Sequence, residues 1–143
     1  MAGCSSALKS SAPSGSATSG GTIKIGFISP ETGQLSVFTQ SNGFVLGQVR
    51  SALAKGLTIG GKKYSVHIIS GDSQSSSARA AAVAAQMVQQ DSVDVLIATA
   101  TPETVIPVSS QAEASGVPCV LTICPWEQWY YKSNGTANTF KYS

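Results

Sequence analysis

Short apolar segments typical of β-strands alternate with helix-like segments through most of this sequence. We expect strands at residues 23–29, 64–70, 93–98 and 119–123, and helices at residues 38–55, 76–90 and 103–115. Parallel strands need long crossover connections, which helices supply, so this order predicts an α/β fold. We therefore expect an open, mostly parallel sheet with helices on both faces.

The right-handed crossover rule predicts how the strands are arranged in that sheet. Numbered along the chain, with a fifth strand at residues 138–142, they should lie in the order 2-1-3-4-5. Residues 64–70 alternate between apolar and polar side chains at most positions, which suits an edge strand and directs His67 outward. Such sheets bind ligands in the crevice at the carboxyl ends of their strands, so a few loops carry the search for a function.

Two of the expected helices show a clear apolar stripe. The helix at residues 76–90 repeats apolar side chains at helical spacing: Ala80, Val83, Ala84, Met87 and Val88. The helix at residues 38–55 does the same with Val45, Val49, Ala52 and Leu53. For the helix at residues 103–115, Thr101 is the expected N-cap, Pro102 fits the first turn, and Glu103 faces the positive end of the helix dipole.

Residues 1–21 differ in composition from the rest of the chain. They are rich in Ser, Gly, Ala and Thr and lack a hydrophobic period, so we expect a flexible tether. Met1-Ala2-Gly3-Cys4 resembles the end of a bacterial lipobox, which makes Cys4 a candidate lipid anchor. The alternative is a chance cysteine near a random start.

Composition argues against several classes of function. The chain has 143 residues, only 11% of them charged, and its net charge of +2 is too small to argue for nucleic acid. No apolar run is long enough to span a membrane. Cys119 and Cys124 lack metal-ligand spacing with His67, so we expect no metal and interpret the two cysteines as small hydrophobes.

The first strand-to-helix turn argues against an enzyme. It reads Ser29-Pro30-Glu31-Thr32-Gly33-Gln34, which has one glycine where phosphate-binding loops have several. Glu31 would repel a phosphate. No nucleophile elbow is present, and a triad is hard to assemble with one histidine. We expect a binding module with no catalytic residues and no cofactor.

Five short motifs, in order, resemble one known family. They are residues 23–33 with their Pro30-Glu31-Thr32-Gly33 turn, Gly60-Gly61-Lys62, Asp72-Ser73-Gln74 with Arg79, residues 93–97, and Gly116-Val117-Pro118. This series is similar to the type I substrate-binding proteins of ABC transporters, the branched-chain amino-acid-binding group. The resemblance runs from about Thr22 to the end of the chain.

The resemblance implies two Rossmann-like α/β lobes that close on a solute between them. Residues 22–143 would then be the N-terminal lobe, without the second lobe. It also implies a membrane permease as partner and a periplasmic or cell-surface location. The lipobox-like start would add Cys4 as the lipid anchor. In this family the first-lobe ligand contacts follow the third and fourth strands, where this sequence has Thr101-Pro102-Glu103 and Cys124-Pro125-Trp126-Glu127. These residues depart from the family's usual serine and small residues.

We expect the ligand site where the loops after the first, third and fourth strands diverge. Its residues would be Thr32, Gly33, Thr99, Thr101, Pro102, Glu103, Thr104, Cys124 and Trp126. Acids at this end of the sheet, beside aromatic rings, favour an amino acid or a small amine or amide. The alternative is that Asp72 and Glu103 only cap helices and that the aromatic rings pack against the missing lobe.

The sequence thus predicts the solute-binding component of a bacterial ABC importer. Two alternatives stay open. One is a sensory ligand-binding domain of the same fold, and the other is an enzyme of flavodoxin-like fold.

Overall fold

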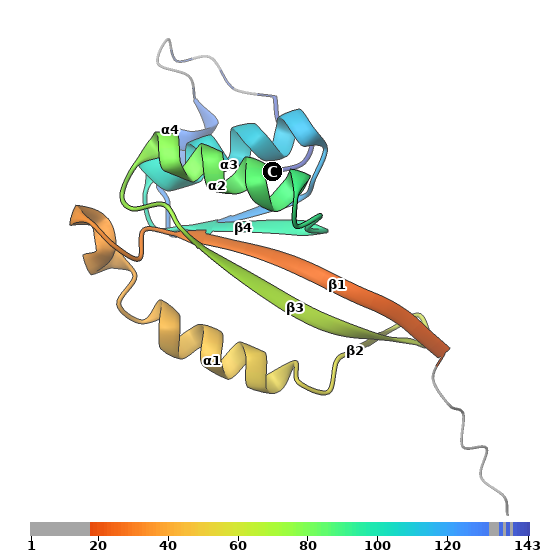
Figure 1. Cartoon of the computed structure of the whole chain (residues 1–143). Helices are drawn as coiled ribbons and strands as arrows, with labels where there is room; N and C mark the ends of the chain where they lie inside the picture. The colour runs from red at the N-terminus through yellow and green to blue at the C-terminus, as the bar shows by residue number, and fades with distance from the viewer. Residues whose placement is uncertain (1–17, 132–134, 136, 138) are drawn as a thin grey trace, which may run out of the picture.

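Five strands form one sheet in the part of the chain that the structure, a computed structural model, describes: residues 18–131, 135, 137 and 139–143. The strands are β1 (Thr18–Ser29), β2 (Leu57–Ile59), β3 (Lys62–Asp72), β4 (Val95–Thr99) and β5 (Cys119–Thr122). The helices are η1 (Gln34–Phe38, a 3₁₀ helix), α1 (Asn42–Ala52), α2 (Ser77–Gln89), α3 (Pro102–Ser115) and α4 (Trp126–Tyr130). Helices α2 and α3 lie on one face of the sheet and α1 lies on the other (Figure 1).

The predicted fold class is confirmed. The sheet has the order β2-β3-β1-β4-β5, and β1 pairs in parallel with both β3 and β4, as β4 does with β5. The four parallel strands therefore have the predicted order. Strands β1 and β3 pair along eleven residues, whereas β4 pairs with β1 only from Ile25 to Ile28. The two long strands consequently extend as a ribbon beyond the rest of the sheet (Figure 1).

Two details at the sheet edges differ from the prediction. The short strand β2 pairs antiparallel with the start of β3, so β3 is covered there and is not a full edge strand. Gly60 and Gly61, with φ of 56° and 78°, form the tight turn of this hairpin. The adjacent glycines are a hairpin signal, but the three residues of β2 are too few to show a strand period.

The predicted fifth strand at residues 138–142 is wrong for its described part. Residues 139–142 are not in a strand, and Asn138 lies outside the described residues. The segment does lie beside β5, since the N–H of Cys119 donates to the carbonyl of Tyr142 at 2.7 Å. Hydrogen bonds from its backbone to the side chain of Glu113 replace the ladder that a strand would need.

Element boundaries differ most in the first third of the chain. Strand β1 begins at Thr18, before the predicted residue 23, and residues 1–17 of the predicted tether lie outside the described residues. Within the helix predicted at residues 38–55, residues 42–52 form α1, and Phe38 is the last residue of the separate 3₁₀ helix η1. Thr39 lies between them, and its hydroxyl donates to the carbonyl of Pro30 at 2.9 Å, which holds this segment against the end of β1.

The hydrophobic core lies between the sheet and helices α2 and α3. Ile28 and Leu96 of the sheet and Val105 and Val108 of α3 have no exposed surface. Helix α2 adds the predicted stripe, of which Ala80, Val83, Ala84 and Met87 are buried. Gly26 and Gly71 allow α2 to approach the strands, because a Cβ at either position would collide with the Met87 side chain.

Helix α1 does not bury its apolar stripe as α2 does. Val45 is 50% exposed and Val49 is 37% exposed. The polar contact between α1 and β3 comes from Arg50, whose guanidinium donates to Ser70 Oγ at 2.9 Å and to the Ile68 carbonyl at 3.3 Å. An apolar stripe predicts a helix, but it does not predict how closely that helix packs on its sheet. His67, on β3, is exposed as predicted.

Candidate functional site

The loops after β1, β3 and β4 meet at one end of the sheet and enclose a cavity of about 420 Å³. We call this cavity the mouth; it is lined by Gly33, Gln34, Leu35, Gln74, Ser75 and Glu103. It lies where the chain leaves β1 toward one side of the sheet and later returns on the other, at β4. Such a switch point is where open α/β sheets bind ligands.

Asp72 fastens the first two of these loops together. Its carboxylate accepts hydrogen bonds from the Thr32 hydroxyl at 2.6 Å and from the N–H groups of Glu31 at 2.9 Å, Thr32 at 3.2 Å and Gln74 at 2.8 Å. Burial opposes ionisation, yet these hydrogen bonds hold the pKa of Asp72 below its usual value. All of its described contacts are structural, so Asp72 shapes the mouth.

Ser75 makes a second connection between the same loops. Its hydroxyl donates to the Thr32 carbonyl at 2.7 Å and accepts from the N–H of Leu35 at 3.0 Å. Gly33 has a φ of 87°, and a Cβ there would collide with the Ser75 side chain. The wall of the mouth is therefore fixed by short hydrogen bonds and by a position that requires glycine.

Three predicted site residues with hydroxyl groups are buried at this end of the sheet. Thr99, Thr101 and Thr104 are all predicted site residues, and none is more than 7% exposed. Thr104 Oγ1 lies 3.0 Å from Ser73 Oγ in a buried hydrogen bond that joins α3 to the loop after β3. Among the described residues, Thr101 Oγ1 is the one buried side-chain oxygen or nitrogen without a hydrogen-bond partner. Burial of a hydroxyl without a hydrogen-bond partner costs free energy, so Thr101 is a candidate for contact with a ligand.

Thr101 is the N-cap of α3, as predicted, but its side chain makes no capping hydrogen bond. Its carbonyl accepts from the N–H groups of Thr104 at 3.0 Å and Val105 at 2.9 Å. The N–H of Glu103 lies in the first turn, where a helix offers no acceptor of its own. Ala100, just before this turn, has a φ of 95°, which is strained for a residue with a Cβ.

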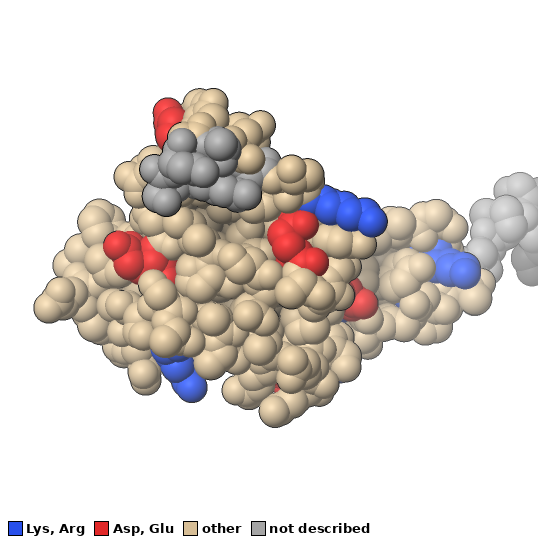
Figure 2. Space-filling view, turned by 90° about the horizontal axis from the view of Figure 1, so that it is seen from above, with Lys and Arg blue, Asp and Glu red and all other residues tan. Residues whose placement is uncertain are grey.

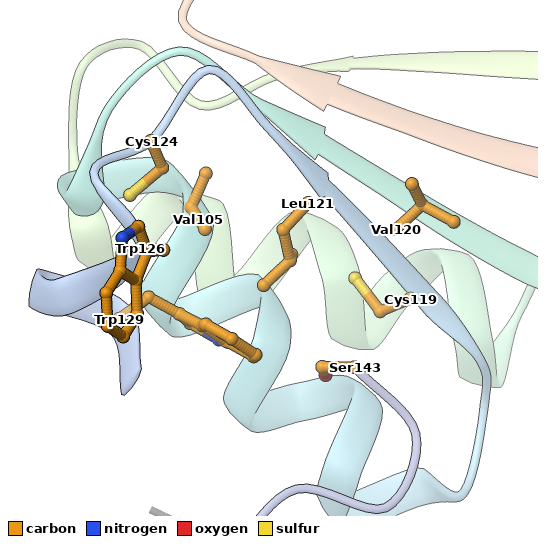
Figure 3. A pocket seen from close by; sticks show the side chains of 8 residues that line it. All are labelled: Val105, Cys119, Val120, Leu121, Cys124, Trp126, Trp129 and Ser143. Atoms are coloured by element: carbon orange, nitrogen blue, oxygen red, sulfur yellow. The ribbon is translucent and has the colours of Figure 1, made fainter. Parts of the chain in front are cut away.

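A second pocket, of about 360 Å³, lies beside β5 (Figure 3). We call it the β5 pocket; its wall is mainly apolar and consists of Val105, Cys119, Val120, Leu121, Cys124, Trp126, Trp129 and Ser143. Two of the predicted ligand residues, Cys124 and Trp126, belong to it. Trp129 Nε1 donates to Ser109 Oγ at 2.9 Å, which fixes that ring against α3.

The nine predicted site residues therefore do not share one cavity. Gly33 and Glu103 line the mouth, and Thr32 anchors its loop. The three threonines are buried and line no described pocket, and Cys124 and Trp126 line the β5 pocket. Pro102 and Glu103 line a groove of about 530 Å³ between α2 and α3, with Ser77, Ala81, Ile106, Pro107, Ser110 and Gln111.

The expectation that every loop at this edge faces one crevice was too simple. Strand β4 lies between β1 and β5, so the loop after β5 begins farther from the loop after β1. Alternate residues of a strand also face opposite sides of the sheet, so neighbouring residues can line different pockets. Gln34, Leu35, Gln74 and Ser75 line the mouth without having been predicted. Gln74 and Ser75 both have positive φ, at 53° and 58°, which no residue pattern in the sequence signals.

The charge of Glu103 acts at more than one of these pockets. It lines both the mouth and the α2–α3 groove. Burial first, and then the negative charge of Glu103, raise the pKa of the Cys124 thiol. Burial, with a smaller effect of Glu113, raises the pKa of Cys119 to about 12, so both thiols are expected to stay protonated at neutral pH.

Charge is sparse around these hollows. Seen from the side that carries α2 and α3, the few acidic and basic side chains are scattered over a largely uncharged surface (Figure 2). Within the described residues, no group of three or more His, Cys, Asp and Glu side chains is placed to hold a metal ion. Within the same residues, none of the helices combines the length and the apolar character needed to cross a lipid bilayer.

Comparison with known families decides the assignment, because a family described as periplasmic binding protein matches residues 22–143. The chain belongs to the periplasmic binding protein family. It is similar to LivJ of Streptococcus pneumoniae, the substrate-binding protein of a branched-chain amino acid transporter, solved in complex with isoleucine. The identity is 30% and the TM-score 0.56, over 70% of this chain and 28% of that one.

Other solved periplasmic binding proteins share the fold at lower identity. The leucine binding protein LivK of Thermotoga maritima has 23% identity and a TM-score of 0.57, over 70% of this chain and 27% of its own. A solute binding protein of Rhodopseudomonas palustris, in complex with 3,4-dihydroxybenzoic acid, has 19% identity and a TM-score of 0.60. The match covers 70% of this chain and 26% of that one. No match is found among curated proteins. This chain of the periplasmic binding protein family spans little more than a quarter of the length of these structures.

Proposed function

We propose that this chain is the N-terminal lobe of the solute-binding component of a bacterial ABC importer. It would bind an amino acid or a small amine or amide against a second lobe, and the closed form would deliver the solute to a membrane permease. The family and the similarity to LivJ support the class of protein. The proposal assigns no catalytic residue and no cofactor.

The observation that carries the solute site is the unpartnered hydroxyl of Thr101. Its oxygen is buried at the start of α3, two residues before the mouth residue Glu103. A solute that reaches this position would supply the missing hydrogen bond, and the N–H of Glu103 offers a second polar contact nearby. The loops around the mouth are already fixed by Asp72 and Ser75, so little ordering would oppose binding.

Glu103 supports the preference for an amine or an amide. It is exposed, and it lines the mouth at the end of α3 where the helix dipole alone would favour an anion. Its carboxylate attracts an ammonium group and repels a second carboxylate. Asp72 is fully engaged by the loops, and Glu31 contacts Ser29 Oγ and Asn42 Nδ2, so Glu103 is the acid we assign to the solute.

Trp126, in the β5 pocket, supports an additional apolar contact with the solute. Its ring is 57% exposed, and its centroid lies 5.9 Å from that of Tyr130 and 6.0 Å from that of Tyr131. An exposed indole among aromatic rings offers a face to an apolar or cationic solute. The location that goes with this function is periplasmic or at the cell surface, with Cys4 as the lipid anchor.

Two measurements on the two-lobe protein that carries this chain test the proposal. Mass spectrometry of solute retained through purification identifies the class. Calorimetry with isoleucine, butylamine and 4-hydroxybenzoate then compares the native protein with Glu103→Gln. We expect binding of a solute with an amine or amide, and loss of affinity for it in the variant. Binding of 4-hydroxybenzoate alone, unaffected by the variant, would refute the ligand class, and binding of no solute would refute the function.

A further inference from the structure

We propose that the end of the β1–β3 ribbon is a contact site for a bilayer of anionic phospholipid. We call this end the ribbon tip; it consists of β2, the Gly60-Gly61 turn, residues 62–64 of β3 and residues 18–21 of β1. The ribbon tip projects away from helices α2 and α3 (Figure 1). The mouth lies beyond the other end of β1, about 36 Å away for a strand of twelve residues. Contact with a bilayer at the ribbon tip would therefore leave the mouth open to solute.

One face of the ribbon tip exposes apolar side chains. Partners in an antiparallel pair point to the same side, and Leu57 pairs with Tyr64 while Ile59 pairs with Lys62. These four side chains share one face because they alternate along both strands. Leu57 is 37% exposed and Ile59 is 53% exposed. Two aliphatic side chains next to a lysine suit the boundary between lipid headgroups and acyl chains.

The ring of Tyr64 extends this face across β1. A Cβ at Gly20 would collide with the ring, so the ring lies against the backbone of β1, where the register shifts between Ser19 and Gly21. Tyr64 is half-buried. A tyrosine has an apolar ring and a polar hydroxyl, and such residues are enriched where a membrane meets water.

The charge of this part of the chain is positive. No acidic residue occurs between Glu31 and Asp72. The same segment holds four side chains that are cationic at neutral pH: Arg50, Lys55, Lys62 and Lys63. The three lysines are exposed and lie at the ribbon tip or just before it. The surface of an anionic bilayer attracts such a group, and each lysine adds to the attraction.

A hollow at the ribbon tip brings two of these lysines together. It has a volume of about 490 Å³ and is lined by Ser19, Gly21, Ala54, Lys55, Gly56, Lys63, Tyr64 and Ser65. Two ammonium groups at one hollow can bind the phosphate of a lipid headgroup. A soluble anion would need only this charge. The exposed aliphatic side chains of Leu57 and Ile59 therefore favour a bilayer as the partner.

The position of Cys4 in the chain fits a bilayer contact at this end, and this point alone rests on the proposed lipid anchor. Cys4 and Thr18 are fourteen positions apart. Fourteen residues span at most about 50 Å. An anchor at Cys4 would therefore keep the ribbon tip within that distance of the bilayer.

Vesicle sedimentation of the two-lobe protein with Cys4→Ser tests the contact without any anchor. The probes are vesicles of phosphatidylcholine alone and vesicles of equal parts phosphatidylcholine and phosphatidylglycerol. We expect binding to the anionic vesicles, and binding to phosphatidylcholine alone that is weaker by roughly tenfold or more. Added salt should weaken binding to the anionic vesicles because it screens the lysines.

Two variants test the two parts of the ribbon tip. Lys62→Gln should weaken binding to the anionic vesicles about fivefold. Its matched control is Arg79→Gln, which removes an exposed positive charge from α2 and should change binding much less. Ile59→Ser should also weaken binding about fivefold, because an apolar side chain no longer enters the bilayer. Its control is Val37→Ser, which removes an exposed aliphatic side chain from η1 and should leave binding unchanged.

Four outcomes would overturn the proposal. The first is the absence of binding to either kind of vesicle, and the second is equal binding to both. The third is an equal loss in Lys62→Gln and Arg79→Gln, which would indicate a general effect of net charge. The fourth is a loss in Lys62→Gln without a loss in Ile59→Ser, which would mean that the ribbon tip binds soluble polyanions. Solute binding at the mouth is measured separately, so the lipid contact and the proposed function can each fail alone.

Discussion

The hydroxyl of Thr32, in the loop after β1, donates a 2.6 Å hydrogen bond to the carboxylate of Asp72 at the end of β3. Both residues stood out in the sequence near the expected ligand site. The structure uses them to fasten two loops together, and three backbone N–H groups bind the same carboxylate. The architecture of the mouth therefore depends on a residue that need not touch the solute.

Replacement of Asp72 should destabilise the fold. In Asp72→Asn the amide nitrogen cannot accept from the Thr32 hydroxyl, and the remaining oxygen is a weaker acceptor. We expect the free energy of unfolding to fall by about 1–3 kcal/mol, measured by chemical denaturation. Thr32→Val removes one of the four bonds and should cost about 1 kcal/mol. Equal stability of Asp72→Asn and the native chain would show that the hydrogen bonds of Asp72 do not contribute to the free energy of unfolding.

The same residue predicts a dependence on pH. The folded pKa of Asp72 lies below its unfolded value, so its contribution is complete above the unfolded pKa and is lost as pH falls through the folded pKa. The stability difference between the native chain and Asp72→Asn should be constant near neutrality and shrink below about pH 4. Denaturation curves at a series of pH values measure it, and a difference that grows on acidification contradicts the assignment.

Gly71 should not tolerate a side chain. A Cβ there would meet Val83 and Met87 of α2, so Gly71→Ala should destabilise the chain by about 1–3 kcal/mol through overpacking. The matched control is Gly43→Ala in the exposed helix α1, where a Cβ meets nothing within 4 Å. That substitution should be neutral or stabilise by up to about 1 kcal/mol. Thermal denaturation measures the stability of both variants. Unchanged stability of Gly71→Ala would refute the close contact of α2 with β3.

Trp126 should contribute to solute binding in the two-lobe protein. If its ring packs on the solute in a closed, desolvated cleft, Trp126→Ala should weaken binding by about 1–3 kcal/mol in calorimetry. Trp126→Phe keeps a ring and should retain much of the affinity. An unchanged affinity in Trp126→Ala would assign the ring to lobe packing, the alternative that the sequence left open.

The regular parts of this fold could be predicted because their signals are local. Helix α2 has one apolar stripe and an N-cap at Ser76, whose hydroxyl accepts from the Arg79 N–H at 3.3 Å, and its observed bounds differ from the prediction by one residue at each end. The order of the parallel strands follows from the handedness of the crossovers.

The candidate site could be predicted only in part because its geometry depends on distant residues. The bonds of Asp72 and Ser75 to the loop after β1 span about forty positions, and no local pattern encodes them. The same holds for residues 141–143, whose N–H groups bond to the side chain of Glu113, 28 to 30 positions away, where the sequence predicted a strand. The burial of Thr101 without a partner likewise depends on how α3 packs on the sheet.

Calorimetry of Thr101→Val in the two-lobe protein is the most direct test of the central claim, that solute binds at the start of α3. Valine keeps the shape of the side chain and removes an oxygen with no partner in the lobe. The stability without solute should therefore be unchanged or higher, while the affinity for the retained solute falls by about 1–2 kcal/mol. Thr58→Val, on the exposed strand β2, is the control and should change neither. An affinity that stays the same in Thr101→Val, with the fold intact, would contradict the account.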